Sequence, residues 1–208
     1  MCHFVEWMRY FAIFVQTYYI HHYTMTEYEK LLAGQRYFYS DKELFKRFMR
    51  AYELTSRINN LTYDRMDEIN HLFHELIPQM DPTATIVAPF RCDMGDRISL
   101  GRNVFINYNC SFLDNGGIDI GDYTLIGPDC HLLTSQHPID YMERRLPQED
   151  SFRISIGNDC WLGANVTICP GVTIGNRVIV AAGSVVVRDV PDDVMVAGNP
   201  AVIKKRLL

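Results

Sequence analysis

The sequence predicts a mainly β protein, a left-handed parallel β-helix that carries an N-terminal α-helical cap. The main observation is a period of six residues, which neither the 3.6-residue period of an α-helix nor the two-residue period of a strand explains. Coils of about eighteen residues, each built from three short strands, would stack like residues on one another and so produce this period. The apolar residues at this spacing are Met94, Leu100, Ile106, Phe112 and Ile118, then Ile120, Ile126 and Leu132, and finally Ile156, Leu162, Ile168, Ile174, Val180 and Val186.

Two further positions of each six-residue unit favour small or β-branched residues. The second position is often glycine, which is expected to let the backbone turn tightly at each corner, often with a positive φ. These glycines are Gly95, Gly101, Gly121, Gly127, Gly157, Gly163 and Gly175. The fifth position is small or β-branched and is expected to point inward; it includes Cys92, Cys110, Cys130 and Cys160, each acting as a small hydrophobic side chain.

The region before the repeats, residues 25–80, is expected to form the helical cap. Two capping boxes, Thr26-x-x-Glu29 and Ser40-x-x-Glu43, predict helix starts. Each helix is expected to dock on the β-helix through one apolar face. The predicted faces are Leu44, Phe45, Phe48, Met49 and Tyr52 in one helix, and Met66, Ile69, Leu72, Phe73 and Leu76 in the next, which Pro78 ends.

Residues 1–24 form a separate, strongly aromatic segment. Its apolar run is too short to span a bilayer, and His21-His22-Tyr23 does not resemble a signal-peptide cleavage site. We expect either a docking extension or an upstream start codon, with Met25 opening the functional chain.

The repeat domain is expected over residues 84–208, with one long interruption at residues 133–153. A coil scaffold has no need for such an excursion, and long ordered loops on rigid scaffolds often carry function. His137 lies where the coil gives way to this loop, at the outward-facing sixth place of its unit. Pro138 favours an extended backbone at His137, which helps to fix its direction. An isolated His-Pro pair would indicate only an exposed loop histidine, but this location favours a functional residue.

Composition excludes several classes of partner. Twenty Lys and Arg residues against 25 Asp and Glu residues give a net charge of −5, and the only basic run is Lys204-Lys205-Arg206, so nucleic acid is not expected as the main partner. The six cysteines form no CxxC pair and no ligand-like cluster, so no metal site is expected. Reduced interior cysteines favour a reducing compartment, and we expect a cytoplasmic protein without a membrane partner.

Several segments share a further pattern. They are Asn107-Tyr-Asn-Cys, His137-Pro-Ile-Asp, Ile156-Gly-Asn-Asp-Cys-Trp-Leu-Gly, Pro170-Gly-Val-Thr-Ile-Gly, Ala181-Ala-Gly-Ser-Val-Val and Gly198-Asn-Pro-Ala, preceded by Met25-Thr-Glu and Leu32-Ala-Gly. Together they resemble the maltose/galactoside O-acetyltransferase family over residues 25–204. The resemblance implies the helical cap of that family, acetyl-CoA as co-substrate, and acetyl transfer to a hydroxyl of a sugar or glycoside.

The same resemblance assigns roles to two residues. A hydroxyl is a poor nucleophile at neutral pH, so a base must remove its proton as it attacks the thioester, and the family's histidine falls on His137. The developing oxyanion needs a hydrogen-bond donor, and the family's proposed stabiliser falls on Asn107. The alternative for Asn107 is an asparagine tolerated in a left-handed corner, because it occupies the second place of its unit.

For the acceptor, the resemblance points to Asp93, to Asp114 or Asn115, and to Glu149, with Asn107 shared between acceptor and cofactor. The family often has an aspartate shortly after the Ala-Gly of the cap. Here Ala33-Gly34 is followed by Gln-Arg-Tyr-Phe-Tyr, so that Phe38 or Tyr39 takes its place. This departure makes a more apolar or aromatic-stacking acceptor plausible.

For acetyl-CoA, the resemblance places small residues along the groove of the pantetheine arm and basic residues near the phosphates. The residues concerned are Gly127, Ala164, Ala182, Val187, Arg188, Lys204 and Lys205, besides Asn107. Trp161 is expected either to wall this pocket or to pack against a neighbouring coil. The resemblance also implies a homotrimer with sites at the clefts between subunits.

Three alternatives stay open at this stage. The acceptor could be a non-sugar hydroxyl, on an antibiotic or a serine-like molecule. The chain could be a non-catalytic β-helix scaffold, which would not need the His-Pro loop. A zinc-dependent hexapeptide enzyme would need three histidines, and the repeat region offers only His131 and His137, on successive faces.

Overall fold

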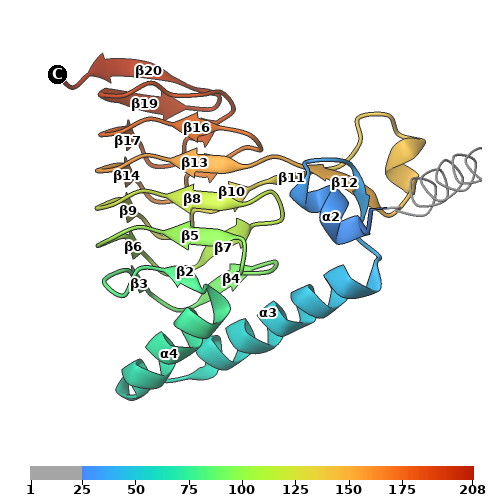
Figure 1. Cartoon of the computed structure of the whole chain (residues 1–208). Helices are drawn as coiled ribbons and strands as arrows, with labels where there is room; N and C mark the ends of the chain where they lie inside the picture. The colour runs from blue at the N-terminus through green and yellow to red at the C-terminus, as the bar shows by residue number, and fades with distance from the viewer. Residues whose placement is uncertain (1–24) are drawn as a thin grey trace, which may run out of the picture.

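Stacked coils of short parallel strands form the body of the protein, as Figure 1 shows for the computed structural model. The structure describes residues 25–208, so the expectations for residues 1–24 lie outside the described residues. Within the coils, Ile156 pairs with Ile174 and Leu162 with Val180, which confirms the predicted stacking of like on like. The predicted β-helix with its helical cap is therefore confirmed.

Each coil contributes one strand to each of three sheets. The first sheet contains β2 (Gln79–Met80), β5 (Ile98–Leu100), β8 (Ile118–Ile120), β13 (Ile154–Ile156) and β16 (Thr173–Ile174). The second contains β3 (Thr85–Ile86), β6 (Phe105–Ile106), β9 (Leu125–Ile126), β14 (Trp161–Leu162), β17 (Ile179–Val180), β19 (Val194–Gly198) and β20 (Ala201–Arg206). The third contains β4 (Phe90–Cys92), β7 (Cys110–Leu113), β10 (His131–Leu133), β15 (Thr167–Ile168) and β18 (Val185–Val186).

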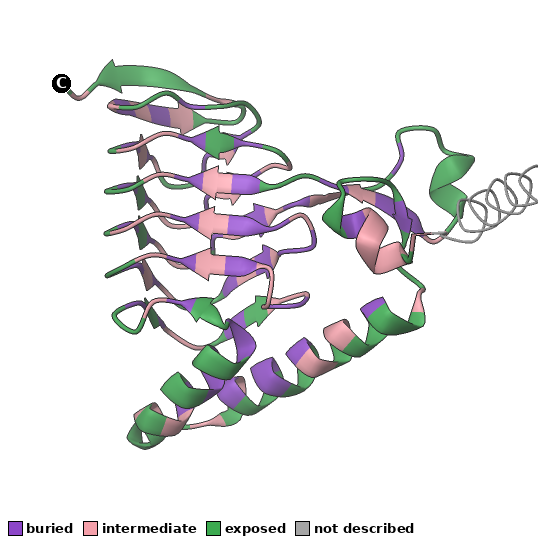
Figure 2. Cartoon of the chain, in the orientation of Figure 1, coloured by how far each residue is buried: buried purple, intermediate pink, exposed green. Residues whose placement is uncertain are grey.

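The repeated apolar side chains fill the interior of the stack, which Figure 2 shows as buried. Three aromatic rings close its first end. Phe73 lies edge-on to Phe90, with ring centroids 6.0 Å apart, and Phe90 lies edge-on to Phe112 at 5.2 Å. Edge-to-face rings at these separations are favourable, so the cap helix that carries Phe73 seals the open end of the core. At the other end β20 folds back antiparallel on β19.

The corners of the coils correct one expectation from the sequence. Positive φ values occur mainly at the fourth position of a unit, as in Asn109, Asn165 and Gly183, and not at most second-position glycines. The second position needs glycine for a different reason: a Cβ on Gly157 would lie 2.7 Å from the carbonyl carbon of Gly175 in the next coil. The spacing between coils, and not the turn, therefore restricts this position.

We name the three corners for later use. The ladder corner joins the first sheet to the second and carries Asp122, Asn158, Asn176 and Asp192. Each of the last three accepts, through its side chain, a hydrogen bond from the backbone N–H of the residue before it in this series. The Asn107 corner joins the second sheet to the third, and the loop corner joins the third to the first.

The cap consists of α2 (Glu27–Leu32), α3 (Lys42–Asn60), a 3₁₀ turn η1 (Tyr63–Arg65) and α4 (Met66–Leu76). The capping box at Thr26 and Glu29 is confirmed. The second predicted box is wrong, because the carboxylate of Asp41, and not Ser40, accepts from the first backbone N–H groups of α3.

The predicted face of α3 is only partly correct. Leu44 is buried and Phe48 half-buried, but Phe45 is 59% exposed and Tyr52 63% exposed. The buried residues are Leu44, Ala51, Leu54, Thr55 and Ile58, a stripe on which small Ala51 lets the helix approach the coils. For α4 the predicted stripe is correct, with Ile69, Leu72, Phe73 and Leu76 buried.

The long loop contributes to a fourth, small sheet at the side of the stack. Its strands β11 (Ser135–Gln136) and β12 (Gln148–Ser151) are antiparallel, and a 3₁₀ turn η2 (Glu143–Arg145) lies between them. Strand β1 (Tyr37–Phe38) of the cap pairs with β12, so the cap and the loop are joined by backbone hydrogen bonds (Figure 1). No helix among residues 25–208 is long and apolar enough to cross a membrane.

Glycine at the second position can be tested by adding one methyl group. We expect Gly157→Ala to destabilise the fold by about 1–3 kcal/mol or more, because its Cβ would overlap the backbone of the next coil. Gly34→Ala is the control, since a Cβ there meets nothing within 4 Å and only its φ of 67° is unfavourable. Thermal unfolding measures both variants. A Gly157→Ala protein no less stable than Gly34→Ala would contradict the stated role of coil spacing.

Candidate active site

His137 follows β11 at the base of the loop and is exposed. Its Nδ1 lies 3.4 Å from the carbonyl oxygen of Gln148 on β12. A carbonyl oxygen can only accept, so Nδ1 carries the proton and Nε2 is left with a free lone pair. The strand pairing of the loop therefore presents an imidazole that can act as a base.

Tyr39 is the aromatic neighbour of His137. The two rings are edge-on, with centroids 6.1 Å apart. The backbone N–H of Tyr39 donates to the carbonyl oxygen of Pro147, which fixes the residue beside the loop. Of the two aromatic residues that replace the acidic residue of the cap, Tyr39 is thus the one that the structure brings to the predicted base.

A buried polar network lies next to His137 in the loop. Glu149 on β12 accepts a hydrogen bond from the hydroxyl of Tyr37 on β1 and another from Nδ2 of Asn115, the latter at 2.9 Å. Asn115 also donates to Ser135, at 3.0 Å, and the Tyr37 hydroxyl lies 2.9 Å from that of Ser151. Burial and the carboxylate of Glu149 raise the pKa of Tyr37 far above its usual range, so it stays a donor.

Sequence reasoning identified Asn115 and Glu149 but missed Tyr37, Ser135 and Ser151. Tyr37 opens the short aromatic run Tyr37-Phe38-Tyr39 of the cap, where it indicates ordinary packing. Its role depends on the pairing of β1 with β12, between residues 112 positions apart in the sequence. The only local signal was that Phe38 or Tyr39 stands where the family often has an aspartate after Ala33-Gly34.

Asp114 and Asp93 lie together at the loop corner but in different environments. Asp114 is fully buried, and its carboxylate accepts from the backbone N–H groups of Asp93, Met94 and Gly95 at 2.8–3.0 Å. Burial raises the pKa of Asp114 to about 6, although these hydrogen bonds lower it. Asp114 therefore organises the backbone of the corner, whereas Asn115, which is 3% exposed, keeps an Oδ1 without a hydrogen-bond partner among residues 25–208.

Asp93 is half-buried and lines a cavity of about 290 Å³ between α3 and the coils. Burial, followed by the charges of Asp114 and Glu149, raises the pKa of Asp93 to about 7. The structure thus brings Asp93, Asn115, Glu149 and His137 to one side of the coil stack.

Asn107 lies on the other side, at the Asn107 corner. Its backbone is not left-handed, since the positive φ of this corner belongs to Asn109, so the alternative of a left-handed asparagine is wrong. The side-chain Oδ1 accepts from the N–H of Tyr108 at 2.8 Å. The Nδ2 group has no hydrogen-bond partner among residues 25–208, and it is free to donate outward.

Above Asn107 the same corner lacks bulky side chains. Backbone N–H groups of Asn107 and Gly127 donate to Ile126 and Leu162 of the following coils, which stacks the second positions in a column. A Cβ on Gly127 would lie 2.8 Å from the amide nitrogen of Ala164, and one on Gly163 would lie 2.6 Å from that of Ala182. The column is therefore a strip of bare backbone against which an extended chain could lie.

The remaining predicted cofactor residues are spread more widely. Val187 and Arg188 follow β18 and so belong to the loop corner, while Lys204 and Lys205 lie on β20 at the end of the stack. All four are exposed. Trp161 on β14 is 54% exposed and faces outward, which shows that it does not pack inside the coil of this chain.

The predicted site therefore falls into two half-sites on opposite edges of the third sheet. Asn107 precedes β7, whereas Asp114, Asn115 and the loop with His137 follow the C-terminal ends of β7 and β10. At about 3.3 Å per residue, the separation is on the order of 20 Å. One chain thus does not bring Asn107 and His137 together.

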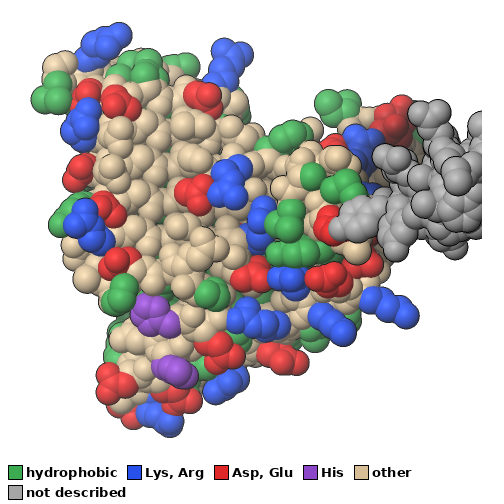
Figure 3. Space-filling view, viewed as in Figure 1, with side chains coloured by type: hydrophobic (Ala, Val, Ile, Leu, Met, Phe, Trp, Pro, Cys, Tyr) green, Lys and Arg blue, Asp and Glu red, His purple; other side chains and the backbone are tan. Residues whose placement is uncertain are grey.

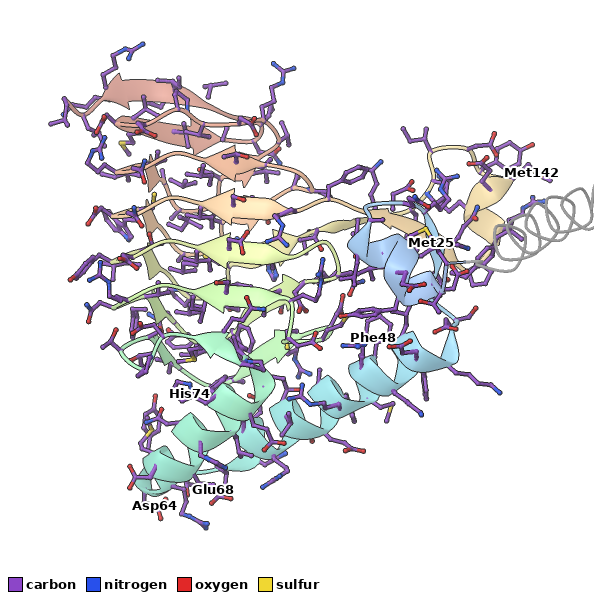
Figure 4. The ribbon with its side chains drawn as sticks, in the orientation of Figure 1. Met25, Phe48, Asp64, Glu68, His74 and Met142 are labelled. Carbon is purple, nitrogen blue, oxygen red and sulfur yellow. The ribbon has the colours of Figure 1, made fainter. Side chains whose placement is uncertain are left out.

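His71 and His74 lie on α4, away from the loop that carries His137. In Figure 4 His74 lies on α4 at the first end of the stack, and Met142 lies in the loop. Figure 3 shows acidic and basic side chains interspersed over the face in view. Within residues 25–208, no group of three or more His, Cys, Asp or Glu side chains is arranged to hold a metal ion.

Comparisons with known proteins cover both parts of the chain. The family model "Bacterial transferase hexapeptide (six repeats)" matches residues 153–188, and "Maltose acetyltransferase hexapeptide capping motif" matches residues 30–81. Nodulation protein L of Rhizobium meliloti (strain 1021) is 38% identical over 181 residues, or 87% of this chain and 99% of that protein.

Two solved structures are also similar to this chain. A maltose O-acetyltransferase from Clostridium difficile 630 is 36% identical with a TM-score of 0.87, over 88% of this chain and 98% of that one. A galactoside acetyltransferase in complex with coenzyme A is 30% identical with a TM-score of 0.86, over 89% of this chain and 92% of that one.

The two aspartates of the loop corner are expected to respond oppositely to neutralisation. The folded pKa of Asp93, about 7, lies above its ordinary 3.8, so its stabilising contribution is full below pH 3.8 and is lost as the pH rises through 7. Asp93→Asn should therefore raise stability at pH 8, by about 1–3 kcal/mol, and this gain should vanish near pH 4.

Asp114→Asn is the matched comparison for Asp93→Asn. It should lower stability by about 1–3 kcal/mol at pH 8, because an amide nitrogen would face a backbone N–H. Urea unfolding of both variants across pH 4–8 makes the measurement. Equal effects of the two substitutions at pH 8 would contradict the different environments assigned to them.

Proposed function

The chain belongs to the maltose/galactoside O-acetyltransferase family of hexapeptide-repeat acetyltransferases, and we propose that it transfers the acetyl group of acetyl-CoA to a hydroxyl of a sugar or glycoside. The observation that carries this proposal is a pair of complementary groups. His137 has a free Nε2 lone pair, and Asn107 has a free Nδ2 donor. These are the base and the oxyanion donor that attack of a hydroxyl on a thioester needs.

In the proposed reaction His137 Nε2 takes the proton of the acceptor hydroxyl as its oxygen attacks the thioester carbon. Asn107 Nδ2 donates to the carbonyl oxygen as negative charge develops there. The carbon–sulfur bond then breaks, the acetyl group stays on the acceptor oxygen, and the imidazolium returns its proton to the CoA sulfur. The hydrogen bond from Nδ1 to Gln148 holds the ring in the required tautomer throughout.

The bare strip of the Asn107 corner supports acetyl-CoA as the donor. Gly127 and Ala164 leave room for the pantetheine arm to approach the backbone, and Lys204 and Lys205 supply positive charge for the phosphates. Arg188, at the loop corner, would supply its charge from a neighbouring subunit. A galactoside acetyltransferase of the same fold is known in complex with coenzyme A.

A homotrimer would join the two half-sites. The loop corner of one subunit, with His137, would face the Asn107 corner of the next subunit. This arrangement is needed because the two corners of one chain are too far apart to act on one substrate. The second sheet supports such packing, because it presents apolar residues outward in register on consecutive strands. They are Phe105, Leu125, Trp161, Ile179 and Met195.

The role of His137 is tested by its removal. His137→Ala should lower kcat by about 10²–10⁴-fold, the range for loss of a general base, with acetyl-CoA affinity little changed. Release of free CoA thiol from acetyl-CoA, over a panel of sugars and glycosides, measures turnover. His74→Ala on α4 serves as the control and should retain activity. Near-wild-type turnover in His137→Ala would overturn the mechanism.

The shared site is tested by mixing two defective chains. His137→Ala and Asn107→Ala proteins should each be nearly inactive. In Asn107→Ala, kcat should fall by about 10²–10³-fold. In trimers assembled randomly from equal amounts of both, about one quarter of the clefts would receive an intact His137 and an intact Asn107 from different subunits. Activity should recover to about that fraction. If mass spectrometry confirms mixed trimers and no activity returns, the two residues do not act across a shared cleft.

A further inference from the structure

Arg36 of the cap holds the long loop at two places. Its Nε and Nη2 donate to the two carboxylate oxygens of Asp150 on β12, at 3.0 Å and 2.8 Å. Its Nη1 donates to the carboxylate of Glu143 in the 3₁₀ turn η2, at 2.6 Å. The planar fork of a guanidinium can bind two carboxylates at once, so one side chain joins the strand to the turn. The backbone pairing of β1 with β12 does not supply this link to η2.

The strand that Arg36 holds is also the strand that contacts His137. In the antiparallel pair of β11 and β12, Asp150 is the register partner of Gln136, the residue before His137. Gln148 on the same strand carries the carbonyl oxygen that lies 3.4 Å from His137 Nδ1. A shift of β12 would therefore move the acceptor that fixes the proton on Nδ1.

The turn η2 holds the chain on the other side of His137. Arg144, which follows Glu143 in this turn, donates through Nη1 to the carbonyl oxygens of the two residues after His137, at 2.9 Å and 3.0 Å. The side chain of Gln148 donates to the backbone carbonyl oxygen of Glu143, at 3.2 Å. The segments before and after His137 are thus both tied to parts of the loop that Arg36 joins.

We propose that Arg36 is a positioning residue for the general base: by joining β12 to η2, it keeps the Gln148 carbonyl oxygen at His137 Nδ1 and so leaves Nε2 free to accept a proton. Arg36 acts through Gln148 and is not itself a catalytic residue. This inference rests on the proposed function, since it concerns the base of that reaction. The Arg36 side chain is 37% exposed, so its ion pairs contribute little to global stability and their loss should leave the fold intact.

The tautomer of His137 is the measurement that a merely structural role would not change. With the Gln148 carbonyl oxygen in place the proton of the neutral imidazole is held on Nδ1, and without it the proton would distribute between the two ring nitrogens. Nitrogen NMR of the full chain labelled with ¹⁵N-histidine, at about pH 8 where an ordinary imidazole is neutral, distinguishes the two forms. The signals that disappear in His137→Ala identify this residue.

We expect the wild-type protein to show the Nδ1-protonated form of His137 and Arg36→Met to show a mixture of both forms. Methionine keeps an unbranched apolar side chain but removes every donor. A His137 tautomer unchanged in Arg36→Met would overturn the proposal, whatever the activity of the protein.

Arg177→Met provides the matched control. Arg177 also lies between two carboxylates, with Nε 2.6 Å from Asp193 and Nη2 3.6 Å from Asp192, and its side chain is 47% exposed. It belongs to the ladder corner, away from the loop. This variant should keep the wild-type tautomer of His137 and the wild-type kcat. A change in either one as large as that in Arg36→Met would refute a specific role of Arg36.

Kinetics test whether the positioning matters for turnover. Arg36→Met should lower kcat by about 10- to 10²-fold with the KM for acetyl-CoA unchanged, because a displacement of about 1 Å can cost up to about 10²-fold in rate. In a protein that already carries Glu143→Gln and Asp150→Asn, Arg36→Met should cause no further loss. A further tenfold loss in that background would show that Arg36 acts by another route, and an unchanged kcat in Arg36→Met would likewise overturn the proposal.

The two measurements separate this inference from the proposed function. If His137→Ala retains wild-type turnover, or no acceptor is acetylated at all, the proposed function fails, and the tautomer of His137 in Arg36→Met still decides whether Arg36 positions the imidazole. If His137→Ala is inactive while Arg36→Met keeps both the tautomer and kcat, the positioning role alone is refuted.

Discussion

Hydrogen bonding between the backbones of successive coils determines where every candidate functional residue lies. Each coil must approach the next closely enough for N–H to C=O bonds of 2.8–3.0 Å, as between Gly127 and Leu162 or Gly163 and Val180. This spacing leaves no volume for a Cβ at Gly127 or Gly157. The requirement that holds the fold together therefore also produces the bare strip beside Asn107, and structure and proposed donor binding share one physical cause.

The helical cap has two different tasks. Through Phe73 its last helix seals the core at the first end of the stack. Through Tyr37 and Arg36 its first segment holds the loop: Tyr37 donates to Glu149, and Arg36 pairs with Asp150 at 2.8 Å and with Glu143 at 2.6 Å. The proposed general base, His137, is thus positioned by strand pairing from a distant part of the chain, and exposed ion pairs such as those of Arg36 add orientation more than stability.

Local sequence patterns predicted the fold well because every coil of the β-helix is built from the same six-residue pattern. The six-residue period, the inward Cys110, Cys130 and Cys160, and the apolar stripe of α4 all concern residues close in sequence, and the structure agrees with each. Cys92 is the exception: Phe90 pairs with Cys110 in the fifth-position register, while Cys92 pairs with Phe112 and is half-buried. The errors arise where a distant contact decides. Which face of α3 is buried depends on the packing of the helix against the coils at Ala51, and the hydrogen bonds of Tyr37 depend on the pairing of β1 with β12. The division of the candidate site residues between two edges of the third sheet follows only from the three-dimensional path of the coils.

The loop leaves the coil stack without disturbing it. Strands β8 and β13, and β10 and β15, lie on either side of the loop in sequence, yet they pair in the same parallel register as uninterrupted neighbours. Residues 134–153 are therefore an insertion that leaves the pairing of the coils unchanged. Changes in the length or sequence of this segment can alter what is recognised beside His137 without shifting the backbone strip on the opposite edge. The fold is modular in this sense: one scaffold can keep its donor chemistry constant while the acceptor specificity of its lateral loop diversifies.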